Sequence, residues 1–319
     1  MRAAFVFAVA VLLGLLFFLF QQLRRFGAGA GKNLTPWQRI VRLSAGLIPL
    51  FLFGVVFWGF FIEPNRLVLH QETIQIDHWP RELSGLRIAI IGDVHTGAWF
   101  IDDRKLQKIV DLTNQQQPDL VVLLGDYMVS NNWHGHRVEP EVTAAALKNI
   151  KAPLGVYAVL GNHDTWYSAE KVRHAFEQNG IHVLENEVAE VNWHDRSFWL
   201  AGLADLWTRP QHIDETIAKV PPGAPVIALT HNPDIFPRLP ASVPLLLAAH
   251  THGGQVTLPI IGAAVVPSDY GQRYTAGHVF ENGHHLFVTT GIGTSIMPVR
   301  FRVPPEVVLL TVSSQIFQT

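Results

Sequence analysis

The stretch LRIAIIGDVH at residues 86–95 decides the fold of this chain. It begins as a short apolar strand and runs directly into a glycine, an aspartate and a histidine. The pattern returns in LVVLLGDY at 120–127, VYAVLGNHD at 156–164, VIALTHN at 226–232 and LLLAAHTHGG at 245–254. We predict strands at 86–91, 120–124, 155–160, 225–229 and 244–248, and helices at 102–116, 139–150, 168–179 and 211–220. Strands that alternate with helices predict an α/β domain with a largely parallel sheet.

The polar residues that follow these strands can all bind a metal ion. The strands end at Asp93 and His95, at Asp126, at Asn162, His163 and Asp164, at His231, and at His250 and His252. Because ligands bind at the carboxyl ends of the strands in open α/β sheets, we expect these side chains to converge. One such motif alone is weak evidence, since Gly-Asp after a strand is often only a turn. Five of them in succession predict a metal centre.

Two further regions are rich in β-forming residues. The runs at 188–193 and 198–203 are predicted strands joined by a hairpin turn at 194–197, and a β-rich tail from residue 255 onward ends in a strand at 307–312. Asp102 and Ser168 are predicted to cap the starts of two helices, and Gly180 is predicted to end one.

The first 62 residues differ in composition from the rest of the chain. They hold no acidic residue, so residues 63–319, with 26 acidic and 18 basic side chains, carry a formal net charge of −8. Residues 3–20 and 43–62 contain no charge, and each run is near the ~20 residues that cross a bilayer as a helix. We therefore predict a membrane anchor at 1–62, with transmembrane helices at about 3–20 and 43–62, and a second domain at 63–319.

The segment between the two apolar runs, residues 21–42, indicates how the anchor is oriented. Its charges are all positive and come from Arg24, Arg25, Lys32, Arg39 and Arg42. The positive-inside rule places this segment in the cytoplasm and the second domain outside it. Three alternatives stay open: two buried core helices, a signal peptide cleaved near residues 28–30, and a twin-arginine signal.

Composition excludes several classes of function. The chain has no cysteine, which excludes disulfides, zinc fingers, iron–sulfur clusters and thiol catalysis. The net charge of −2, and the −8 of residues 63–319, disfavour tight binding of long nucleic acid. The 16 histidines, all of which follow residue 62, favour a metal-binding protein instead.

As a set, the five motifs resemble those of the calcineurin-like metallophosphoesterases. The family's blocks are Asp-x-His, Gly-Asp, Gly-Asn-His-Asp/Glu, a lone His and Gly-His-x-His, and they match residues 93–95, 125–126, 161–164, 231 and 249–252. The segment GIGTSIMPVR at 291–300 is similar to a membrane-associated bacterial branch. There are two departures: Ala249 stands where the family has glycine, and no acid follows Asp126 at the common position. The resemblance implies a two-sheet β sandwich flanked by helices, here preceded by an N-terminal transmembrane helical hairpin.

The resemblance also implies two divalent metal ions. It assigns Asp93, His95, Asp126 and His252 to one ion, and Asp126, Asn162, His231 and His250 to the other. Asp126 then bridges both, because a carboxylate has two acceptor oxygens. The mixture of imidazole, carboxylate and amide ligands favours Mn, Fe or Zn. In this scheme His163 stabilises the phosphoryl oxygen or protonates the leaving group, and Asp164 orients the ring of His163.

The function that follows from the resemblance is hydrolysis of phosphate esters, with diesters favoured, through attack by a hydroxide that bridges the two metals. One alternative is a pyrophosphatase acting on a lipid-linked substrate, like those that act on UDP-2,3-diacylglucosamine. Another is a non-catalytic, metal-stabilised binding protein.

We expect a multi-pass protein of the bacterial inner membrane whose partners are a phosphate-ester substrate and the bilayer, with no nucleic acid. The oligomeric state stays open. Arg300 is either a ligand for an anionic substrate or a surface arginine.

Overall fold

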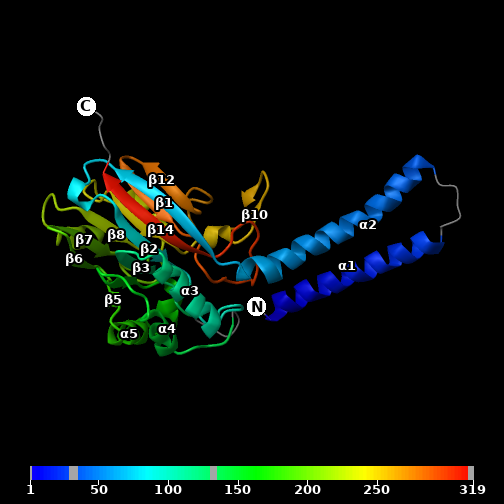
Figure 1. Cartoon of the computed structure of the whole chain (residues 1–319), viewed down its shortest axis with the longest axis horizontal. Coiled ribbons are helices and arrows are strands. Elements are labelled where there is room, and N and C mark those ends of the chain that lie inside the picture. The colour runs from blue at the N-terminus through cyan, green and yellow to red at the C-terminus, as the bar shows by residue number, and fades with distance from the viewer. Residues whose placement is uncertain (1, 29–34, 130–134, 315–319) are drawn as a thin grey trace.

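Two six-stranded sheets packed face to face form the body of the molecule (Figure 1). The computed structural model describes residues 2–28, 35–129 and 135–314. The first sheet has the order β1 (Val68–Ile76), β14 (Glu306–Ser314), β2 (Leu86–Ile91), β3 (Leu120–Leu124), β4 (Val156–Val159) and β5 (His182–Val183). The second has the order β12 (Gly277–Glu281), β13 (His284–Val288), β9 (Leu245–Ala248), β8 (Val226–Leu229), β7 (Arg196–Gly202) and β6 (Glu187–Trp193).

Both sheets have a parallel centre, as the sequence predicts. Strands β2 to β5 are parallel to one another, and so are β7, β8, β9 and β13. The antiparallel pairs are β14 with β2, β12 with β13, and β6 with β7. The predicted two-sheet α/β sandwich is therefore confirmed, and the carboxyl ends of the central strands of each sheet lie at a common edge.

Alternate residues of the central strands face different layers of the core, as the pleat of a strand requires. Ile88 and Ile90 of β2 belong to the cluster between the sheets, together with Leu229 and Leu247 of the second sheet. Ala89 lies in the other cluster, beneath the helices. That cluster joins the first sheet to α3 (Asp103–Gln115), α4 (Pro140–Leu147) and α5 (Asn162–Gln178), while α6 (Ile213–Ile217) packs on the outer face of the second sheet.

The predicted caps are found, but some element bounds differ. Asp102 accepts the backbone N–H of Lys105 at the start of α3. Helix α5 begins at Asn162, six residues before the predicted start, and breaks at Ser168, whose side chain accepts the N–H of Lys171. The predicted helix at 211–220 shortens to α6, because the side chain of Gln211 bonds to loop carbonyls instead.

Two strand boundaries also correct the sequence prediction. Trp193 pairs directly with Arg196, so the hairpin turn contains two residues rather than the four predicted at 194–197. Strand β1 was not predicted, because its sequence, VLHQETIQI, mixes polar and apolar residues and it lies at the edge of the first sheet.

Two long helices extend from the sandwich and lie side by side (Figure 1). Helix α1 (Arg2–Ala28) and helix α2 (Pro36–Phe57) are both longer than the predicted apolar runs. Thr35 and Gln38 form a capping box that starts α2, and this box explains why the helix begins before residue 43. Both helices are long and apolar enough to cross a membrane. Apolar side chains such as Phe17 and Phe51 are exposed along them.

The end of α2 is fastened to the sandwich by polar contacts. A π-helical turn, Trp58–Ile62, follows α2, and the backbone N–H of Arg300 donates to the carbonyl of Gly59 within it at 2.9 Å. The indole of Trp58 donates to Glu63 at 2.6 Å, and Lys105 of α3 donates to the carbonyl of Asn65 at 3.1 Å. The orientation of α2 is therefore tied to the sheet layers.

Candidate metal centre

All the predicted site residues lie at the common edge where the central strands end. Asp93 and His95 follow β2, Asp126 follows β3, Asn162, His163 and Asp164 form the first turn of α5 after β4, His231 follows β8, and His250 and His252 follow β9. Each of these nine side chains is buried, with at most 6% of its surface exposed. The two sheets thus place their strand-end residues in one buried cluster.

The ligand atoms form three overlapping groups. These are Asp93, His95 and His252; His95, Asp126 and His163; and Asp126, His231 and His250, with the atoms of each group within 4.8 Å of one another. Oδ2 of Asp126 lies 3.6 Å from Nε2 of His95 and 3.3 Å from Nε2 of His231. Asp126 therefore stands between the residues from the two sheets, which is the position that a bridging carboxylate needs.

Several buried oxygen and nitrogen atoms of this cluster could bind a cation and lack a hydrogen-bond partner among the described residues. Oδ1 of Asp93, Oδ1 of Asn162 and Nε2 of His250 have no hydrogen-bond partner within the described part of the chain. Imidazole nitrogens also face each other, at 3.2 Å between His95 and His252 and 3.0 Å between His231 and His250. Buried polar atoms normally have partners, so carboxylate, amide and imidazole acceptors that converge in this way match the donor set of divalent metal ions.

The backbone of this cluster is strained in a way that aims the side chains inward. Five of its residues have positive φ, between 49° and 73°: Asp93, His95, Asp126, His250 and His252. Positive φ is uncommon for residues other than glycine, and it persists only where the surrounding structure over-determines it. Such strain clusters at functional sites, and here it lies in the turns that follow β2, β3 and β9.

Ala249, which departs from the family pattern, is accommodated by a glycine opposite it. A Cβ placed on Gly92 would lie 2.7 Å from the methyl group of Ala249. Gly92 therefore leaves the space that the extra methyl group occupies, and Ala249 is completely buried there. The departure changes the local packing where β2 and β9 end and removes no residue of the cluster.

Asp164 makes contacts that differ from those expected of a residue that orients His163. Its two carboxylate oxygens accept three backbone N–H groups, from Asp126 at 2.7 Å, Tyr127 at 2.9 Å and Gly161 at 2.9 Å. The side chain thus fastens the turn after β3 to the start of α5. Burial, with the nearby charge of Asp126, raises the pKa of Asp164 to about 7, and the bonds from Gly161 and Tyr127 oppose this rise.

The electrostatics of the cluster follow from burial and from close charges. Burial raises the pKa of Asp93 to about 7. Burial acts in the same direction on Asp126, but His231 and His163 hold its pKa well below the usual range. Burial would lower the pKa of His231, yet Asp126 raises it to about 10, and burial together with His231 lowers the pKa of His250 to about 3. Asp126 is thus the carboxylate that the surrounding residues hold ionised.

Two exposed tryptophans flank the cluster, and neither lies within the five motifs of the sequence, although Trp166 follows the third motif by two residues. The ring of Trp166 lies 5.0 Å from that of His163, and the ring of Trp207 meets His250 edge-on at 4.3 Å. About half of each indole surface is exposed. Asp205 holds Trp207 in place by accepting its backbone N–H at 3.1 Å. The sequence signal for this loop was available, because Asp205 follows shortly after the predicted strand at 198–203.

Arg300 has a structural role, and neither sequence interpretation of it is right. The side chain is completely buried. Its guanidinium donates to the carbonyls of Gly293, Thr290 and Val303 at 2.6 to 3.1 Å. Because Gly293 donates its own N–H to the carbonyl of Asp93, Arg300 supports the loop behind the cluster.

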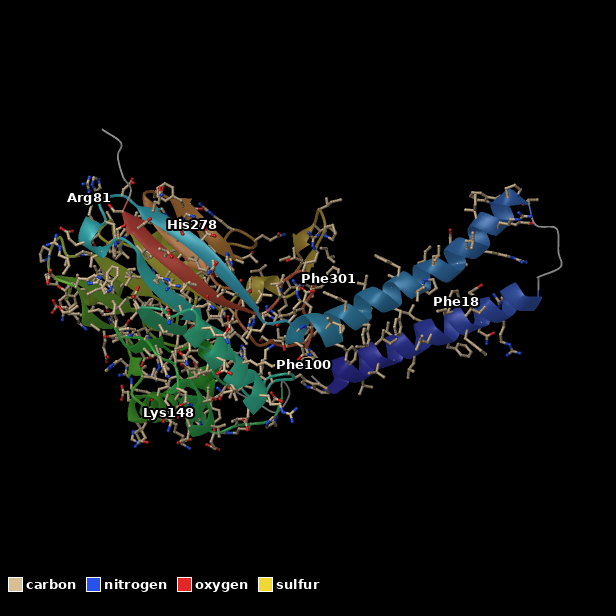
Figure 2. The ribbon with its side chains drawn as sticks, viewed as in Figure 1. Phe18, Arg81, Phe100, Lys148, His278 and Phe301 are labelled. Atoms are coloured by element: carbon tan, nitrogen blue, oxygen red, sulfur yellow. The ribbon has the colours of Figure 1, made fainter. Side chains whose placement is uncertain are left out.

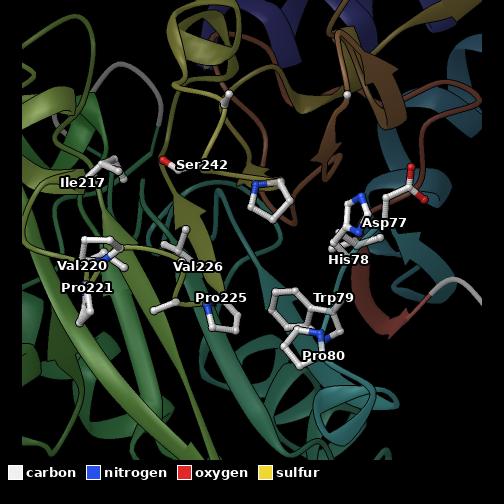
Figure 3. Close-up of a pocket in the computed structure, with 17 residues that line it drawn as sticks. Asp77, His78, Trp79, Pro80, Ile217, Val220, Pro221, Pro225, Val226 and Ser242 are labelled. Atoms are coloured by element: carbon white, nitrogen blue, oxygen red, sulfur yellow. The ribbon is translucent and has the colours of Figure 1, made fainter.

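A shallow cavity of about 530 Å³ lies elsewhere in the molecule, at the amino ends of β8 and β9 (Figure 3). Trp79, Pro221, Pro225 and Val226 contribute to its largely apolar lining. His231 and His250 follow the opposite, carboxyl ends of the same two strands. The chemistry of the molecule is therefore concentrated at the carboxyl edge and not in this cavity.

The fold and the buried cluster of Asp, His and Asn side chains define a class of phosphoesterase. Residues 86–254 match the family model for calcineurin-like phosphoesterases, and the chain belongs to this family. It is a metal-dependent phosphoric ester hydrolase. The family uses divalent metals, and the three groups of ligand atoms are where this chain can hold them.

Three relatives illustrate what the chain is similar to. An uncharacterized metallophosphoesterase of Bacillus subtilis, YkuE, is 28% identical over 258 residues, which cover 80% of this chain and 88% of YkuE. The phosphodiesterase YaeI of Escherichia coli is 30% identical over 237 residues, which cover 70% of this chain and 81% of YaeI. A transmembrane protein with a metallophosphoesterase domain from Danio rerio is 31% identical over 263 residues, which cover 77% of this chain and 56% of the Danio rerio protein.

Proposed function

We propose that this chain is a membrane-anchored phosphodiesterase with a dinuclear metal centre. The observation that carries the proposal is the position of Asp126, which belongs to two of the three groups of ligand atoms and lies within 3.6 Å of histidines from both sheets. A residue that serves two ions has to be a carboxylate in this place, because it offers two acceptor oxygens and offsets the repulsion between the cations.

The proposed ligand sets follow the two sides of Asp126. Asp93, His95 and His252 lie on one side, with Nε2 of His252 3.6 Å from Oδ1 of Asp93. His231 and His250 lie on the other, and Asn162 joins them, since the next residue along the chain donates its N–H to Asp126 at 2.8 Å. The mixture of imidazole, carboxylate and amide favours Mn, Fe or Zn over Mg, which prefers oxygen ligands.

The chain's own residues position the substrate and move the proton. When bound, two divalent ions supply charge neutralisation at the phosphoryl group and lower the pKa of water. His163 lies beside His95, with ring centroids 4.8 Å apart, and is the most exposed of the nine buried residues. We assign to it the stabilisation of a phosphoryl oxygen or the protonation of the leaving alkoxide. Asp164 contributes by holding the turn that carries Asp126.

A diester is the favoured substrate, and the domain division supports an anchored enzyme. The relative YaeI is named a phosphodiesterase, which agrees with the preference inferred from the sequence. Residues 1–62 form the proposed anchor of two membrane-crossing helices, and residues 63–319 form the proposed enzyme domain. The cations of residues 21–42 predict that the enzyme domain lies outside the cytoplasm. Family membership and the complete ligand cluster argue against a non-catalytic binding protein.

The test is a comparison of simple esters with the full chain in detergent. The protein is stripped with a chelator and then reloaded separately with Mn²⁺, Zn²⁺, Fe²⁺ or Mg²⁺. We expect bis(p-nitrophenyl) phosphate to be hydrolysed faster than p-nitrophenyl phosphate, with two ions bound per chain by metal analysis. Preferred hydrolysis of the monoester would overturn the diester assignment, and full activity with one ion per chain would overturn the dinuclear one.

A further inference from the structure

A small hairpin beside the metal centre exposes an unusual amount of apolar surface. It consists of β10 (Thr257–Leu258) and β11 (Gly262–Ala263), which form a two-stranded sheet of their own. Ile260 at its tip is fully exposed, and Ile261 and Val265 expose 64% and 73% of their surfaces. Single exposed apolar residues are normal on soluble proteins, but a contiguous exposed group marks an interaction surface.

The sequence around this tip lacks the charges that a solvated loop usually carries. Residues 255–268, QVTLPIIGAAVVPS, contain no charged side chain, and neither do residues 291–299. The second segment adds Ile296, which is 67% exposed, to the apolar surface of the hairpin. The side chain of Gln255 joins the two segments, because it accepts the N–H of Ser295 at 2.6 Å and donates to the carbonyl of Met297 at 3.3 Å.

The hairpin is held next to the helix that leaves the sandwich. Its base pairs with Phe301, which donates its N–H to the carbonyl of Gln255 at 2.8 Å and accepts the N–H of Thr257 at 3.0 Å. The neighbouring residue, Arg300, donates its backbone N–H to the carbonyl of Gly59 in the π-helical turn that follows α2. Figure 2 places Phe301 beside that end of α2, and Figure 1 shows the hairpin on the side of the sandwich from which both long helices extend.

The hairpin is also continuous with the metal centre. It begins five residues after His252, and the Cβ that Gly254 lacks would lie 2.5 Å from Cβ of Ala263 in β11. The turn that follows the last ligands is therefore packed directly against the hairpin. The base of the hairpin is consequently held close to the strand ends that form the site.

We propose that this hairpin, with Ile296 beside it, is a foot that inserts into the surface of the lipid bilayer. With the hairpin in the bilayer, the metal centre acts on a phosphoester carried by a lipid. This substrate assignment rests on the proposed function. The bilayer is the occupant because the base of the hairpin is bonded, through Phe301 and Arg300, to the end of a helix long and apolar enough to cross it. An uncharged apolar tip of this size buries itself among headgroups and upper acyl chains, as monotopic anchors do.

The absence of cysteine from the chain allows a direct test of the foot. Ile260→Cys and Phe280→Cys are prepared in the full chain, each labelled with an environment-sensitive fluorophore and reconstituted into phosphatidylcholine vesicles that contain brominated lipid. Phe280 is the matched control, because it is an exposed apolar residue, at 56%, on β12. We expect blue-shifted emission and several-fold stronger quenching at position 260 than at 280. Equal quenching at the two positions would overturn the proposal. A blue shift at 260 without quenching by lipid would also overturn it, in favour of a second copy of the chain.

A second experiment tests the lipid substrate separately. The double variant Ile260→Ser/Ile261→Ser is compared with the unmodified chain on two substrates. One is soluble bis(p-nitrophenyl) phosphate, and the other is a phosphodiester in vesicles whose phosphate links p-nitrophenol to diacylglycerol. In both, water attacks phosphorus and the bond to p-nitrophenolate breaks. We expect unchanged turnover of the soluble diester and a several-fold loss on the lipid diester.

The outcomes of the second experiment separate the two proposals. Equal rates of the variant and the unmodified chain on the lipid diester would overturn the lipid assignment. If the unmodified chain hydrolyses neither diester, the proposed function fails, while the quenching result still decides whether the foot is in the bilayer.

Discussion

Asp164 accepts the backbone N–H of Asp126 at 2.7 Å through the same oxygen that accepts the N–H of Gly161. The carboxylate at the start of α5 therefore fixes the turn that carries the proposed bridging residue. The link joins the ends of β3 and β4, two adjacent parallel strands, at the edge of the sheet where the site lies. Because Asp164 is completely buried, we expect a change at this residue to act on the metal centre through this backbone.

Asp164→Asn is accordingly expected to disturb both stability and metal binding. Both oxygens of the Asp164 carboxylate accept backbone N–H groups, but an asparagine amide has only one acceptor oxygen. In the variant, the NH₂ group would face a backbone N–H that the carboxylate binds in the unmodified chain. Loss of a buried hydrogen bond to a charged group costs about 1–3 kcal/mol, and we expect a decrease of that size in the free energy of unfolding. Urea unfolding and metal analysis measure the two effects, with exposed Asp195→Asn as the control. Unchanged metal content in Asp164→Asn would contradict the positioning role.

Asp126→Ala is expected to release both ions. One side chain serves both ligand sets in the proposed arrangement, so its removal takes a ligand from each and leaves the cations to repel each other. Metal analysis of the purified variant should show far less than two ions per chain, and hydrolysis of bis(p-nitrophenyl) phosphate should fall to background. Retention of two ions would rule out the bridging assignment.

His163→Ala separates catalysis from metal binding. His163 is a positioned acid–base group and not a ligand in the proposed scheme, so its loss should lower kcat by roughly 10²–10⁴. The two ions should remain, as measured by metal analysis on the same preparation. If the variant also loses metal, His163 is a metal ligand and not an acid–base group. Its membership of one of the three groups of ligand atoms would then explain the loss.

Much of the site was predictable because its signals are local. Asp93, Asp126, His231 and His250 each follow a short apolar strand, and strand ends of a parallel sheet meet at one edge whatever the rest of the fold does. The same locality explains why β2, β3, β8 and β9 were predicted to within one residue of their ends.

The features that were missed depend on partners far away in the sequence. The contacts of Asp164 with the turn at Asp126 span 38 residues, and no local pattern marks them. Arg300 is buried by loops folded around it, although arginine is usually exposed. Strand β1 is parallel to β14, more than 200 residues away, and its polar residues gave no clear alternation.

The pair Glu306 and His70 predicts a pH dependence of stability. Oε1 of Glu306 accepts the backbone N–H of Thr290, and Oε2 lies 3.0 Å from Nδ1 of His70. Burial acts to raise the pKa of Glu306, but the hydrogen bonds from His70 and Thr290 outweigh burial and hold this pKa below its ordinary value of 4.5. The bond to Glu306 raises the pKa of His70 above its ordinary 6.5.

The two shifts have opposite signs and define a window. The lowered pKa of Glu306 gives stability that is present above pH 4.5 and is lost as the pH falls through the folded value. The raised pKa of His70 gives stability that is complete below pH 6.5 and is lost as the pH rises through its folded value. Urea unfolding from pH 3 to 9 should show that the advantage of the unmodified chain over Glu306→Gln is greatest between about pH 4.5 and 6.5. His70→Gln should abolish the alkaline decline alone; an advantage independent of pH would contradict the assignment.

The side of the membrane on which the sandwich lies can be tested at the chain end. The five cations of residues 21–42 and the absence of acidic residues before Glu63 predict that this segment stays in the cytoplasm. The start of α1 and the sandwich lie together at the other end of the helix pair (Figure 1), so both are expected on the extracytoplasmic side. A reporter active only outside the cytoplasm, fused to Thr319, should be active, and a cytoplasm-only reporter at the same place should be silent. Changing Arg24, Arg25, Arg39 and Arg42 to Asn should weaken this preference, because these charges set the orientation. The reverse pattern of reporter activity in the unmodified chain would place the site, and any lipid phosphoester that it hydrolyses, at the cytoplasmic leaflet.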